Sequence, residues 1–502
     1  MAPNWPHIDL PHPPGRRPVI GDLLAVRPPK PFQNLMAAAD DLGPVFEIRL
    51  GRQKMVFVQD TELARELCDE KRFEKKLPPG LAALRETAGD GLFTAYSDEP
   101  SWSLAHDLLK PAFTRSAMQS YHGVMNDVCS ELISLWDNAS GPVDVSPALT
   151  KMTLETIGRT SFSTSFDSFT TDEQHPFVTA MVESLRRGQR RGALSAVPGG
   201  RLLLRRGAKE FDKHRSFVDG MLDDIIGARI ASGDTSTHDL LGLMLHSAHE
   251  ESGDKLDPLN IRYQINTFLV AGHETTSGAL SFALHYMTRD PSVVAKAQAE
   301  TDAVLGADPD AEPAFEQVAK FRYLRRCLDE ALRLWPTAPA FTRGPRTSTV
   351  VGGRYPMGPD DWATVLIPKI HRDPAVWGEQ AESYDPDHFL PANVRARPAH
   401  TYFPFGVGER ACIGRQFTLH EAVLVLARLF HRYDMKADPA YELAIAERLT
   451  LMPVGLELSL TRRTPSPEAI LDRSPDSAAA EGDACPVDHV AEAMCPVTHT
   501  RG

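Results

Sequence analysis

Phe403-Pro404-Phe405-Gly406-Val407-Gly408-Glu409-Arg410-Ala411-Cys412-Ile413-Gly414 is the most informative segment of this chain. Gly406 and Gly408 permit a tight turn whose amide hydrogens point inward. Cys412 then stands just before an expected helix, where the helix dipole and free amides favour a thiolate. Gly414 leaves room for a flat group near the backbone. A thiolate in such a turn suits a metal, whereas a free cysteine taken alone is more often a buried structural residue.

The composition indicates a globular protein. The 502 residues are 42% hydrophobic and 24% charged, and the net charge is −13. These values exclude a disordered or fibrous chain and argue against a nucleic-acid partner, which needs a basic surface. A local basic patch for an acidic protein partner stays open. No run approaches the roughly 18 apolar residues of a membrane helix, so no membrane insertion is expected.

The cellular setting is predicted from the N-terminus and the cysteines. The N-terminus lacks the apolar centre of a secretory signal. The six cysteines are too scattered for a disulfide framework. Both features favour a cytoplasmic location.

Three regions are expected along the chain: a proline-rich segment over residues 1–17, one large domain over 18–463, and a disordered tail over 464–502. The tail is rich in Ala, Asp, Glu, Pro and Ser and cannot bury enough surface to offset ordering entropy. It contains two similar units, Cys485-Pro-Val-Asp-His489 and Cys495-Pro-Val-Thr-His499. They could bind a metal or heme, although a disordered tail rarely forms a site in advance.

The domain is predicted to be mainly α-helical with a minor β portion. Alternating residues in 45–50 and 55–58, around a turn at Gly51-Arg52, predict a β-hairpin. Helical periodicity dominates from Thr61 onward. Long helices are expected at 213–231, 258–289, 291–305 and 416–432, and further strands near 347–351, 363–367 and 442–460.

Three motifs resemble the cytochrome P450 family. The pattern Phe405-Gly-x-Gly-x-Arg410-x-Cys412-x-Gly414 resembles its heme-thiolate signature. Ala271-Gly-His-Glu-Thr-Thr276 resembles the oxygen-activating segment of the central helix, and Glu330-Ala-Leu-Arg333 resembles the Glu-x-x-Arg pair behind the heme. The resemblance covers residues 18–462 and implies the P450 fold as a single heme-enclosing domain. It also implies heme b as cofactor and Cys412 as the axial ligand of the iron.

The resemblance assigns roles to the other motif residues. Glu274 and Thr275 are the expected catalytic pair, which would supply a titratable carboxylate and a hydroxyl for proton delivery. Ala271 and Gly272 would leave space beside the iron. A zinc-protease interpretation of His273-Glu274 fails, because Ser277 stands where a second histidine is required.

The Glu-x-x-Arg pair has its own chemistry. Glu330 and Arg333 are three residues apart, so they share one helix face and can pair. The family completes the pair with an arginine, and His388 stands at that position here. The structural trio Glu330, Arg333 and His388 can therefore depend on pH.

Further residues are assigned to the cofactor and the substrate. Trp102 and His106 lie four apart on one helix face and match the family's propionate position. The expected heme contacts are Lys75, Trp102, His106, Phe405, Gly406, Arg410 and Gly414. The expected substrate lining is apolar and suits a long alkyl chain; it comprises Leu81, Ala88, Phe93, Val270, Ala271, Ala338 and Leu449.

The resemblance is strongest to the heme domain of bacterial self-sufficient fatty-acid hydroxylases, in which a diflavin reductase is fused to the P450. It implies subterminal hydroxylation of fatty acids with O2 and electrons from NAD(P)H. No reductase follows residue 463. A separate electron-transfer protein is therefore expected (ferredoxin or flavodoxin with a reductase, or a diflavin reductase), unless the chain is a heme domain cut from a fusion.

One departure concerns the substrate carboxylate. The arginine and tyrosine that hold it in that group align with Gln53 and Phe57, so bidentate capture is lost. Arg52 and Lys54 are near enough to substitute weakly. The alternatives left open are a P450 acting on another lipid or natural product, a peroxide-driven heme enzyme, and a heme sensor without turnover.

Overall fold

The structure is a computed structural model, and it describes residues 9–27, 30–51, 53–195, 208–448 and 450–466. Three features of the sequence analysis lie outside these residues: Arg52, Leu449 and the two Cys-Pro-Val-x-His units of the tail.

Helices account for most of the described chain. The α-helices are α1 Pro31–Ala39, α2 Thr61–Leu67, α3 Pro79–Ala82, α4 Arg85–Ala88, α5 Pro100–Leu109, α6 Arg115–Asp137, α7 Val145–Phe162, α8 Pro176–Ser195, α10 Ala208–Ser232, α11 Leu240–His246, α12 Pro258–Met287, α13 Pro291–Leu305, α14 Phe315–Val318, α15 Arg322–Leu334, α16 Ile367–Ile370, α17 Pro374–Trp377, α18 Pro391–Ala396 and α19 Arg415–Arg432. Three 3-10 turns complete them: η1 Lys110–Phe113, η2 Pro386–Phe389 and η3 Gly408–Arg410.

The strands are short and form several small sheets. They are β1 Val45–Leu50, β2 Gln53–Val58, β3 Phe73–Lys75, β4 Val143–Asp144, β5 Ala340–Pro345, β6 Thr349–Val351, β7 Tyr355–Met357, β8 Ala363–Leu366, β9 Tyr433–Ala437, β10 Ala444–Glu447, β11 Leu451–Val454 and β12 Glu457–Arg462. The prediction of a mainly α-helical domain with a minor β portion is confirmed. The four long helices fall where periodicity placed them, as α10, α12, α13 and α19.

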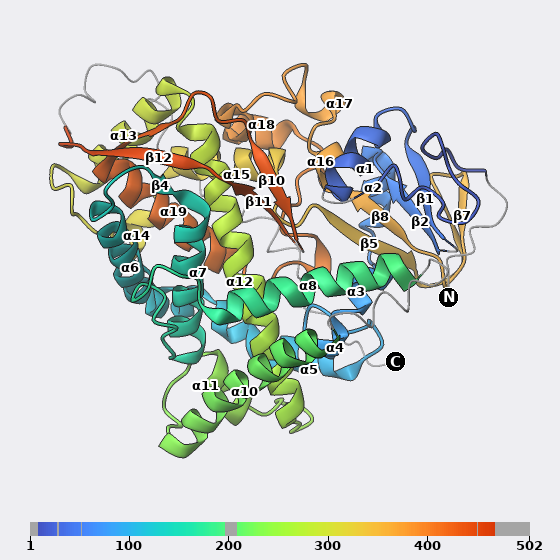
Figure 1. The fold of residues 1–502 in the computed structure, drawn as a ribbon, viewed down its shortest axis with the longest axis horizontal. Coiled ribbons are helices and arrows are strands. Elements are labelled where there is room, and N and C mark those ends of the chain that lie inside the picture. Colours follow the sequence, from blue (N-terminus) through green and yellow to red (C-terminus); the bar gives the residue numbers. More distant parts are fainter. Residues whose placement is uncertain (1–8, 28–29, 52, 196–207, 449, 467–502) are drawn as a thin grey trace, which may run out of the picture.

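The largest sheet has five strands in the order β1-β2-β8-β5-β3, and only the β2–β8 pair is parallel. The predicted hairpin is its β1–β2 pair, in which Phe46 faces Phe57 across the strands. This sheet lies to one side of the helical body, on the right in Figure 1. Strands β3 and β5 were not predicted, although both carry site residues.

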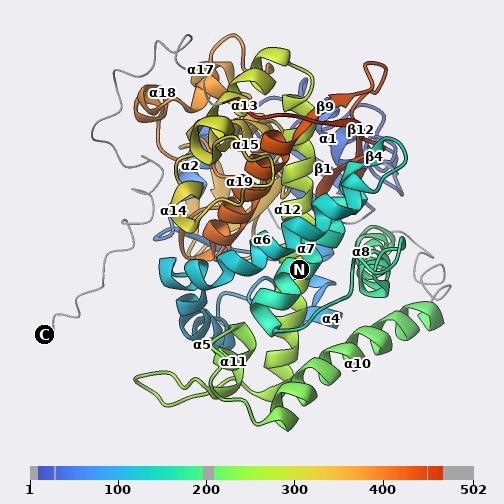
Figure 2. The same cartoon turned by 90° about the vertical axis from the view of Figure 1, so that its left-hand side faces the viewer.

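The 30-residue helix α12 runs through the centre of the helical body (Figures 1 and 2). The Asp257 side chain caps its start by accepting from the backbone N–H groups of Leu259 and Asn260. Helices α7, α15 and α19 pack against α12, so most of its residues are buried. This arrangement places the middle of α12 beside the loop that precedes α19.

Both ends of the described chain are fastened to the domain. Leu10 is buried in the core on the sheet side, and the Glu47 N–H donates to the Pro11 carbonyl at 2.9 Å. At the other end, the Ser466 N–H donates to the Asp302 carboxylate at 3.0 Å. The predicted boundary at 463 stays a prediction. No helix in the described ranges is long and apolar enough to cross a membrane.

Candidate functional site

The loop before α19 is held in a tight turn by its glycines. Gly406 and Gly408 have φ values of +73° and +70°, the left-handed region that favours glycine. A Cβ at Gly408 would stand 1.9 Å from the Glu70 carboxylate. The same carboxylate accepts the N–H of Glu409 at 2.7 Å. The predicted turn therefore requires glycine at both positions for its backbone conformation, and at Gly408 also to avoid a clash with Glu70.

Cys412 ends this turn with an accessible sulfur. Its N–H donates to the Phe405 carbonyl at 2.8 Å, which closes the loop. Within the described chain, Cys412 is the one exposed cysteine; the buried ones are Cys68, Cys129 and Cys327. Although the residue is exposed, protein atoms surround the sulfur closely and reduce its solvation. This desolvation raises the pKa of the Cys412 thiol, whereas the Gly414 N–H and the charge of Arg415 lower it.

The raised pKa differs from the thiolate expected at a helix start. Desolvation outweighs the helix amides here, so the free thiol is the favoured form. A bound metal deprotonates a coordinating thiol outright. The described residues hold no cluster of three or more His, Cys, Asp or Glu side chains that could bind a bare ion. A metal at Cys412 would therefore need its remaining ligands from a prosthetic group.

The middle of α12 presents small and hydroxylated side chains to the same region. Ala271 is exposed and Thr275 half-buried, although His273 and Glu274 between them are buried. The Thr275 hydroxyl donates to the Ala271 carbonyl at 2.7 Å. Because residues four apart share one helix face, Ala271 and Thr275 form one accessible strip on a buried helix.

One contact joins this part of α12 to the helix that follows the Cys412 loop. The hydroxyls of Thr276 and Thr418 lie 3.3 Å apart and join α12 to the first turn of α19. Gly272 makes room for helix packing, because a Cβ there would stand 3.0 Å from Ile157 of α7. Its expected role in leaving space beside the iron stays a prediction.

Glu274 forms an ion pair that the sequence did not predict. Arg448 Nη1 donates to its carboxylate at 3.2 Å, and the Glu274 side chain is 1% exposed. Its second oxygen is buried without a hydrogen-bond partner in the described chain. The carboxylate thus keeps an acceptor site for a proton or a water molecule beside Thr275.

Glu330 and Arg333 form a fully buried pair. Arg333 donates from Nε and Nη2 to the two Glu330 oxygens, each at 2.7 Å. The remaining donors reach the carbonyls of His371, Ala381 and Ser383. His388 Nδ1 lies 3.0 Å from Glu330 Oε1. The structure therefore brings the three predicted structural residues together.

His371, which the sequence analysis did not single out, links this cluster to the cysteine loop. The Phe403 N–H donates to His371 Nε2 at 3.0 Å. The proton therefore sits on Nδ1, which donates to the Arg333 carbonyl at 3.2 Å. Burial holds the pKa of His371 well below its usual value, so the neutral ring keeps this arrangement.

Three cations converge on a cavity of about 120 Å³ next to the cysteine loop. Lys75 of β3 and Arg343 of β5 are directly opposite in the strand register, and Arg410 comes from η3. Burial, then the charges of Arg410 and Arg343, lowers the pKa of Lys75 to about 7. Burial and then Arg343 lower the pKa of Arg410 to about 10. Arg343 Nε is buried without a hydrogen-bond partner in the described chain.

The other residues that line this cavity are Glu70, Phe73, Glu74, Ser97, Trp102, Arg346 and Glu409. The Arg410 guanidinium lies 4.0 Å from the Trp102 ring, and His106 stacks on that ring at 5.0 Å. Glu74 pairs with Lys76 and Arg346. A cluster of cations with an unused donor fits carboxylates such as heme propionates. Lys75, Trp102 and Arg410 were predicted here and Arg343 was not.

The predicted substrate-lining residues in the described chain are accessible or half-buried. Phe93 is 38% exposed, and its ring lies 4.6 Å from Lys75 Nζ. Ala338 is also exposed, and the Thr337 side chain before it touches Gly278 of α12. Leu81, Ala88 and Val270 are half-buried. Accessible side chains in otherwise buried segments are the pattern expected around an internal cavity.

Two residues of the β1–β2 hairpin near the expected channel mouth already have partners. Phe57 is buried and stacks on Phe46 at 5.4 Å. Lys54 is engaged too, because its Nζ lies 2.8 Å from Glu47 Oε2. Side chains alternate between the two faces of a strand. Lys54 and Phe57 therefore lie on opposite faces of β2, and each already has a partner there.

Comparisons with known proteins agree with this geometry. The family model described as Cytochrome P450 matches residues 11–459. The chain is 42% identical over 434 residues to bifunctional cytochrome P450/NADPH–P450 reductase 2 of Bacillus subtilis, covering 86% of this chain and 40% of that protein. It is 40% identical over 447 residues to a Bacillus cereus protein also named bifunctional cytochrome P450/NADPH–P450 reductase, covering 88% and 41%. It is 36% identical over 450 residues to a self-sufficient cytochrome P450 monooxygenase of Penicillium freii, covering 89% and 42%. The chain thus spans about two fifths of the length of these relatives.

Proposed function

Because this chain belongs to the cytochrome P450 family, we propose that it is a heme-thiolate monooxygenase that hydroxylates C–H bonds of a hydrophobic substrate. Fatty acids are the proposed substrate class, and subterminal carbons are the proposed positions. The observation that carries the proposal is that an accessible cysteine in the loop before α19 and an accessible strip on α12 lie on two helices joined by the Thr276–Thr418 contact.

Heme b would bind at two features of the site, the Cys412 loop and the cluster of cations beside it. Cys412 would bind the heme iron, and Lys75, Arg343 and Arg410 would hold the propionates. The other proposed contacts, which would flank the ring, are Trp102, His106, Phe405, Gly406 and Gly414. Bound heme supplies a redox-active iron at which dioxygen is reduced.

The residues of α12 would then move protons to the reaction. Glu274 is anchored by Arg448 yet keeps one oxygen without a protein partner, so it can exchange a proton with a water molecule. The Thr275 hydroxyl donates to the Ala271 carbonyl and keeps its lone pairs free to accept. Thr275 can therefore pass a proton along while it excludes stray water. Ala271 adds no bulk where the substrate carbon must approach.

Electrons would come from NAD(P)H through a separate electron-transfer protein, such as a ferredoxin or flavodoxin with its reductase, or a diflavin reductase. The names of two relatives join a P450 with an NADPH–P450 reductase on one chain, which supports this electron source. A cytoplasmic location is proposed as well, because the four cysteines in the described chain are free.

Turnover assays test this function directly. The full chain loaded with heme should show the carbon monoxide–ferrous spectrum of a thiolate heme, and Cys412→Ala should abolish it. With NADPH, a reductase and palmitic acid, the parent should form hydroxylated acids. Thr275→Ala should consume NADPH while product falls and peroxide rises, because protons then reach the wrong oxygen.

A reaction with peroxide in place of NADPH and the reductase distinguishes the proposed monooxygenase from a peroxide-driven enzyme and from a heme sensor. If peroxide alone supports hydroxylation at the same rate as NADPH with a reductase, a peroxide-driven enzyme is favoured. Heme binding without any product across a lipid panel would contradict the monooxygenase proposal.

A further inference from the structure

Arg448 stands at the turn of the β10–β11 hairpin, directly after β10, and its side chain reaches the central helix α12. Its Nη1 donates to Glu274 Oε1 at 3.2 Å. The Glu274 side chain is 1% exposed, and that of Arg448 is 26% exposed. Glu274 Oε2 is buried without a hydrogen-bond partner in the part of the chain that the structure describes. The two oxygens of this carboxylate are therefore unlike, because a cation holds Oε1 whereas Oε2 is left to accept.

The inner strand of the hairpin is fixed against α12. The Leu451 N–H on β11 donates to the Thr337 carbonyl at 2.9 Å. The Leu451 carbonyl approaches α12 so closely that a Cβ at Gly278 would stand 2.9 Å from it. Strand β11 and helix α12 are thus packed backbone to backbone, and Arg448 extends toward Glu274 from a support that lies directly on the helix.

The outer strand of the hairpin is fastened to α1. The Glu447 carboxylate on β10 accepts the backbone N–H groups of Phe32 and Gln33 at 2.6 and 2.8 Å, and the Gln33 side-chain amide at 2.9 Å. It caps the start of α1, whose own N-cap residue makes no side-chain cap, and a negative charge is favoured there. Two consecutive residues of the hairpin therefore face different elements: Glu447 holds α1 and Arg448 holds Glu274 (Figure 1).

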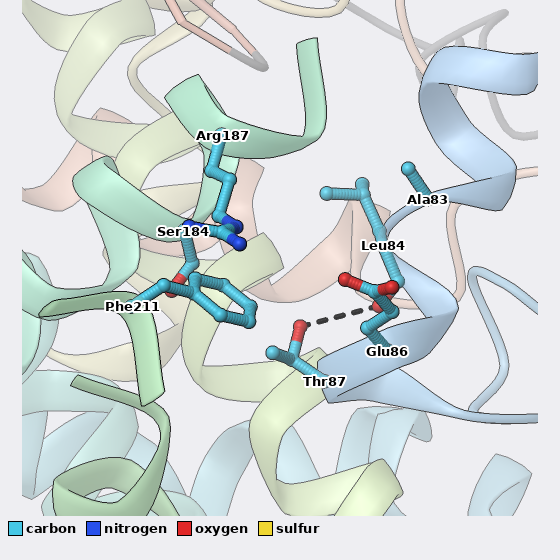
Figure 3. Close-up of a pocket in the computed structure, with 7 residues that line it drawn as sticks. All are labelled: Ala83, Leu84, Glu86, Thr87, Ser184, Arg187 and Phe211. Atoms are coloured by element: carbon cyan, nitrogen blue, oxygen red, sulfur yellow. Dashed lines mark hydrogen bonds between the residues drawn. The ribbon is translucent and has the colours of Figure 1, made fainter. Parts of the chain in front are cut away.

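Helix α12 is itself held on both sides of Glu274. Before Glu274, Asn266 Nδ2 donates to the Thr87 carbonyl at 3.0 Å. Thr87 lies in a small pocket between the α3–α4 segment and helices α8 and α10, where its hydroxyl donates to the Leu84 carbonyl at 3.2 Å (Figure 3). After Glu274, Gly278 lies against β11. Because the backbone of α12 is fixed, the direction of the Glu274 carboxylate depends on the contacts of its side chain.

Arg448 supplies the contact that sets this direction. The last torsion of a glutamate side chain is broad and roughly two-fold, so a carboxylate without a partner exchanges its two oxygens freely. The ion pair with Arg448 removes that freedom at Oε1. A guanidinium keeps its protons in proteins, so Arg448 orients the acid and does not deliver a proton itself.

We propose that Arg448 is a positioning residue for proton delivery: it fixes Oε1 of Glu274 and so makes Oε2 the oxygen that exchanges protons beside Thr275. The inference rests on the proposed function, in which Glu274 and Thr275 move protons. It adds a residue from a distant hairpin, and that residue determines which oxygen of the acid takes part.

The first measurement is the amount of hydroxylated palmitic acid formed per NADPH consumed by the heme-loaded protein with a reductase. Arg448→Gln removes the charge that holds Oε1 and should lower this ratio about tenfold, the scale of a charged hydrogen bond, while peroxide rises. The dissociation constant of palmitic acid, followed by the Soret shift, should stay unchanged, because the pair acts in the reaction and not in substrate binding. Arg448→Lys, which keeps the charge, should recover most of the ratio.

Two controls isolate the contact with Glu274. Arg262 lies on the same helix, and its Nε donates to Asp223 of α10 at 2.8 Å near the surface. Arg262→Gln therefore removes an ion pair of α12 outside the site and should leave the ratio unchanged. Arg448 acts through Glu274, so adding Arg448→Gln to Glu274→Gln should lower the ratio no further than Glu274→Gln alone.

Urea denaturation of the same variants measures the pair without turnover. Arg448→Gln leaves the buried Glu274 carboxylate without its cation, which destabilises the folded protein. Its urea midpoint should fall below that of the parent, and the same change should lower the midpoint less in the Glu274→Gln protein. An equal fall in both proteins would show that Arg448 stabilises the fold through other contacts, and it would overturn the inference.

The remaining outcomes separate the inference from the proposed function. An unchanged ratio in folded Arg448→Gln overturns the inference while the proposed function stands, and so does a further fall when Arg448→Gln is added to Glu274→Gln. If Arg448→Gln does not fold, the double variant, which lacks both charges, is compared with Glu274→Gln and decides in the same way. A parent that forms no product with NADPH and the reductase overturns the proposed function, and the inference with it, whatever the urea titrations show.

Discussion

Glu421 on α19 is a buried carboxyl group, and we predict that Glu421→Gln stabilises the protein progressively as the pH rises. Its side chain is 1% exposed, and both carboxyl oxygens lack a hydrogen-bond partner in the described chain. The nearby Thr156 hydroxyl donates instead to the Met152 carbonyl at 3.1 Å. Burial raises the pKa of Glu421 from its ordinary 4.5 to about 8, with Thr156 lowering it slightly.

The direction of this pH dependence follows from the protonation of Glu421 in the folded and the unfolded protein. Above about pH 4.5 the unfolded chain releases this proton while the folded protein keeps it until about pH 8. The stability contributed by Glu421 is therefore complete below pH 4.5 and is lost as the pH rises to about 8. The slope is about 1.4 kcal/mol per pH unit, so the loss is about 5 kcal/mol over the whole range and about 3 kcal/mol between pH 6 and 8.

The assay is urea denaturation of the heme-loaded protein at pH 6, 7 and 8, followed by circular dichroism. Glutamine has nearly the shape of glutamate and does not titrate. The free energy of unfolding of Glu421→Gln should therefore fall less than that of the parent, by about 3 kcal/mol between pH 6 and 8. Glu316→Gln, an exposed site on α14, should follow the parent. Parallel pH profiles for Glu421→Gln and the parent would refute the reasoning.

Three further changes probe the site. Arg343→Gln should release heme to apomyoglobin about tenfold faster, because one charged hydrogen bond to a propionate is lost; an unchanged rate would remove Arg343 from the heme site. His388→Ala should lower the free energy of unfolding by about 1.5–3 kcal/mol, since Glu330 loses a charged hydrogen bond. His388→Arg should recover most of that loss in the same urea titration. Phe93→Ala should shift the distribution of hydroxylated carbons measured by mass spectrometry, and an identical distribution would place its ring outside the substrate path.

The parts of the site that could be predicted are local in sequence. The turn at Gly406 and Gly408 follows from backbone freedom, and both glycines have the positive φ that such a turn requires. The Glu330–Arg333 pair follows from helical spacing. Helices α12 and α19 follow from periodicity over many residues. Each of these inferences needs only neighbouring residues.

The parts that escaped prediction depend on pairing between distant segments. Strand β3 has three residues, and β5 ends in Gly344-Pro345, a pattern more typical of a turn. The sequence therefore gave no sign that Arg343 faces Lys75. The contacts of Arg448 and His371 were not predicted for the same reason, because their partners Glu274 and Phe403 lie far away in the chain. The alternation of β2, in contrast, could have indicated that Lys54 and Phe57 face opposite sides.

The opposed pair Lys75 and Arg343 links folding of this sheet edge to the cofactor. Like charges directly across two strands destabilise a sheet, and burial of both side chains adds to that penalty. Glu74 is already paired with Lys76 and Arg346, whereas Glu70 and Glu409 also line the cavity and offset part of the repulsion. An anion bound between Lys75, Arg343 and Arg410 removes the repulsion and restores the charge that burial opposes on Lys75. If the propionates bind here as proposed, their binding would stabilise the β3–β5 edge that holds them.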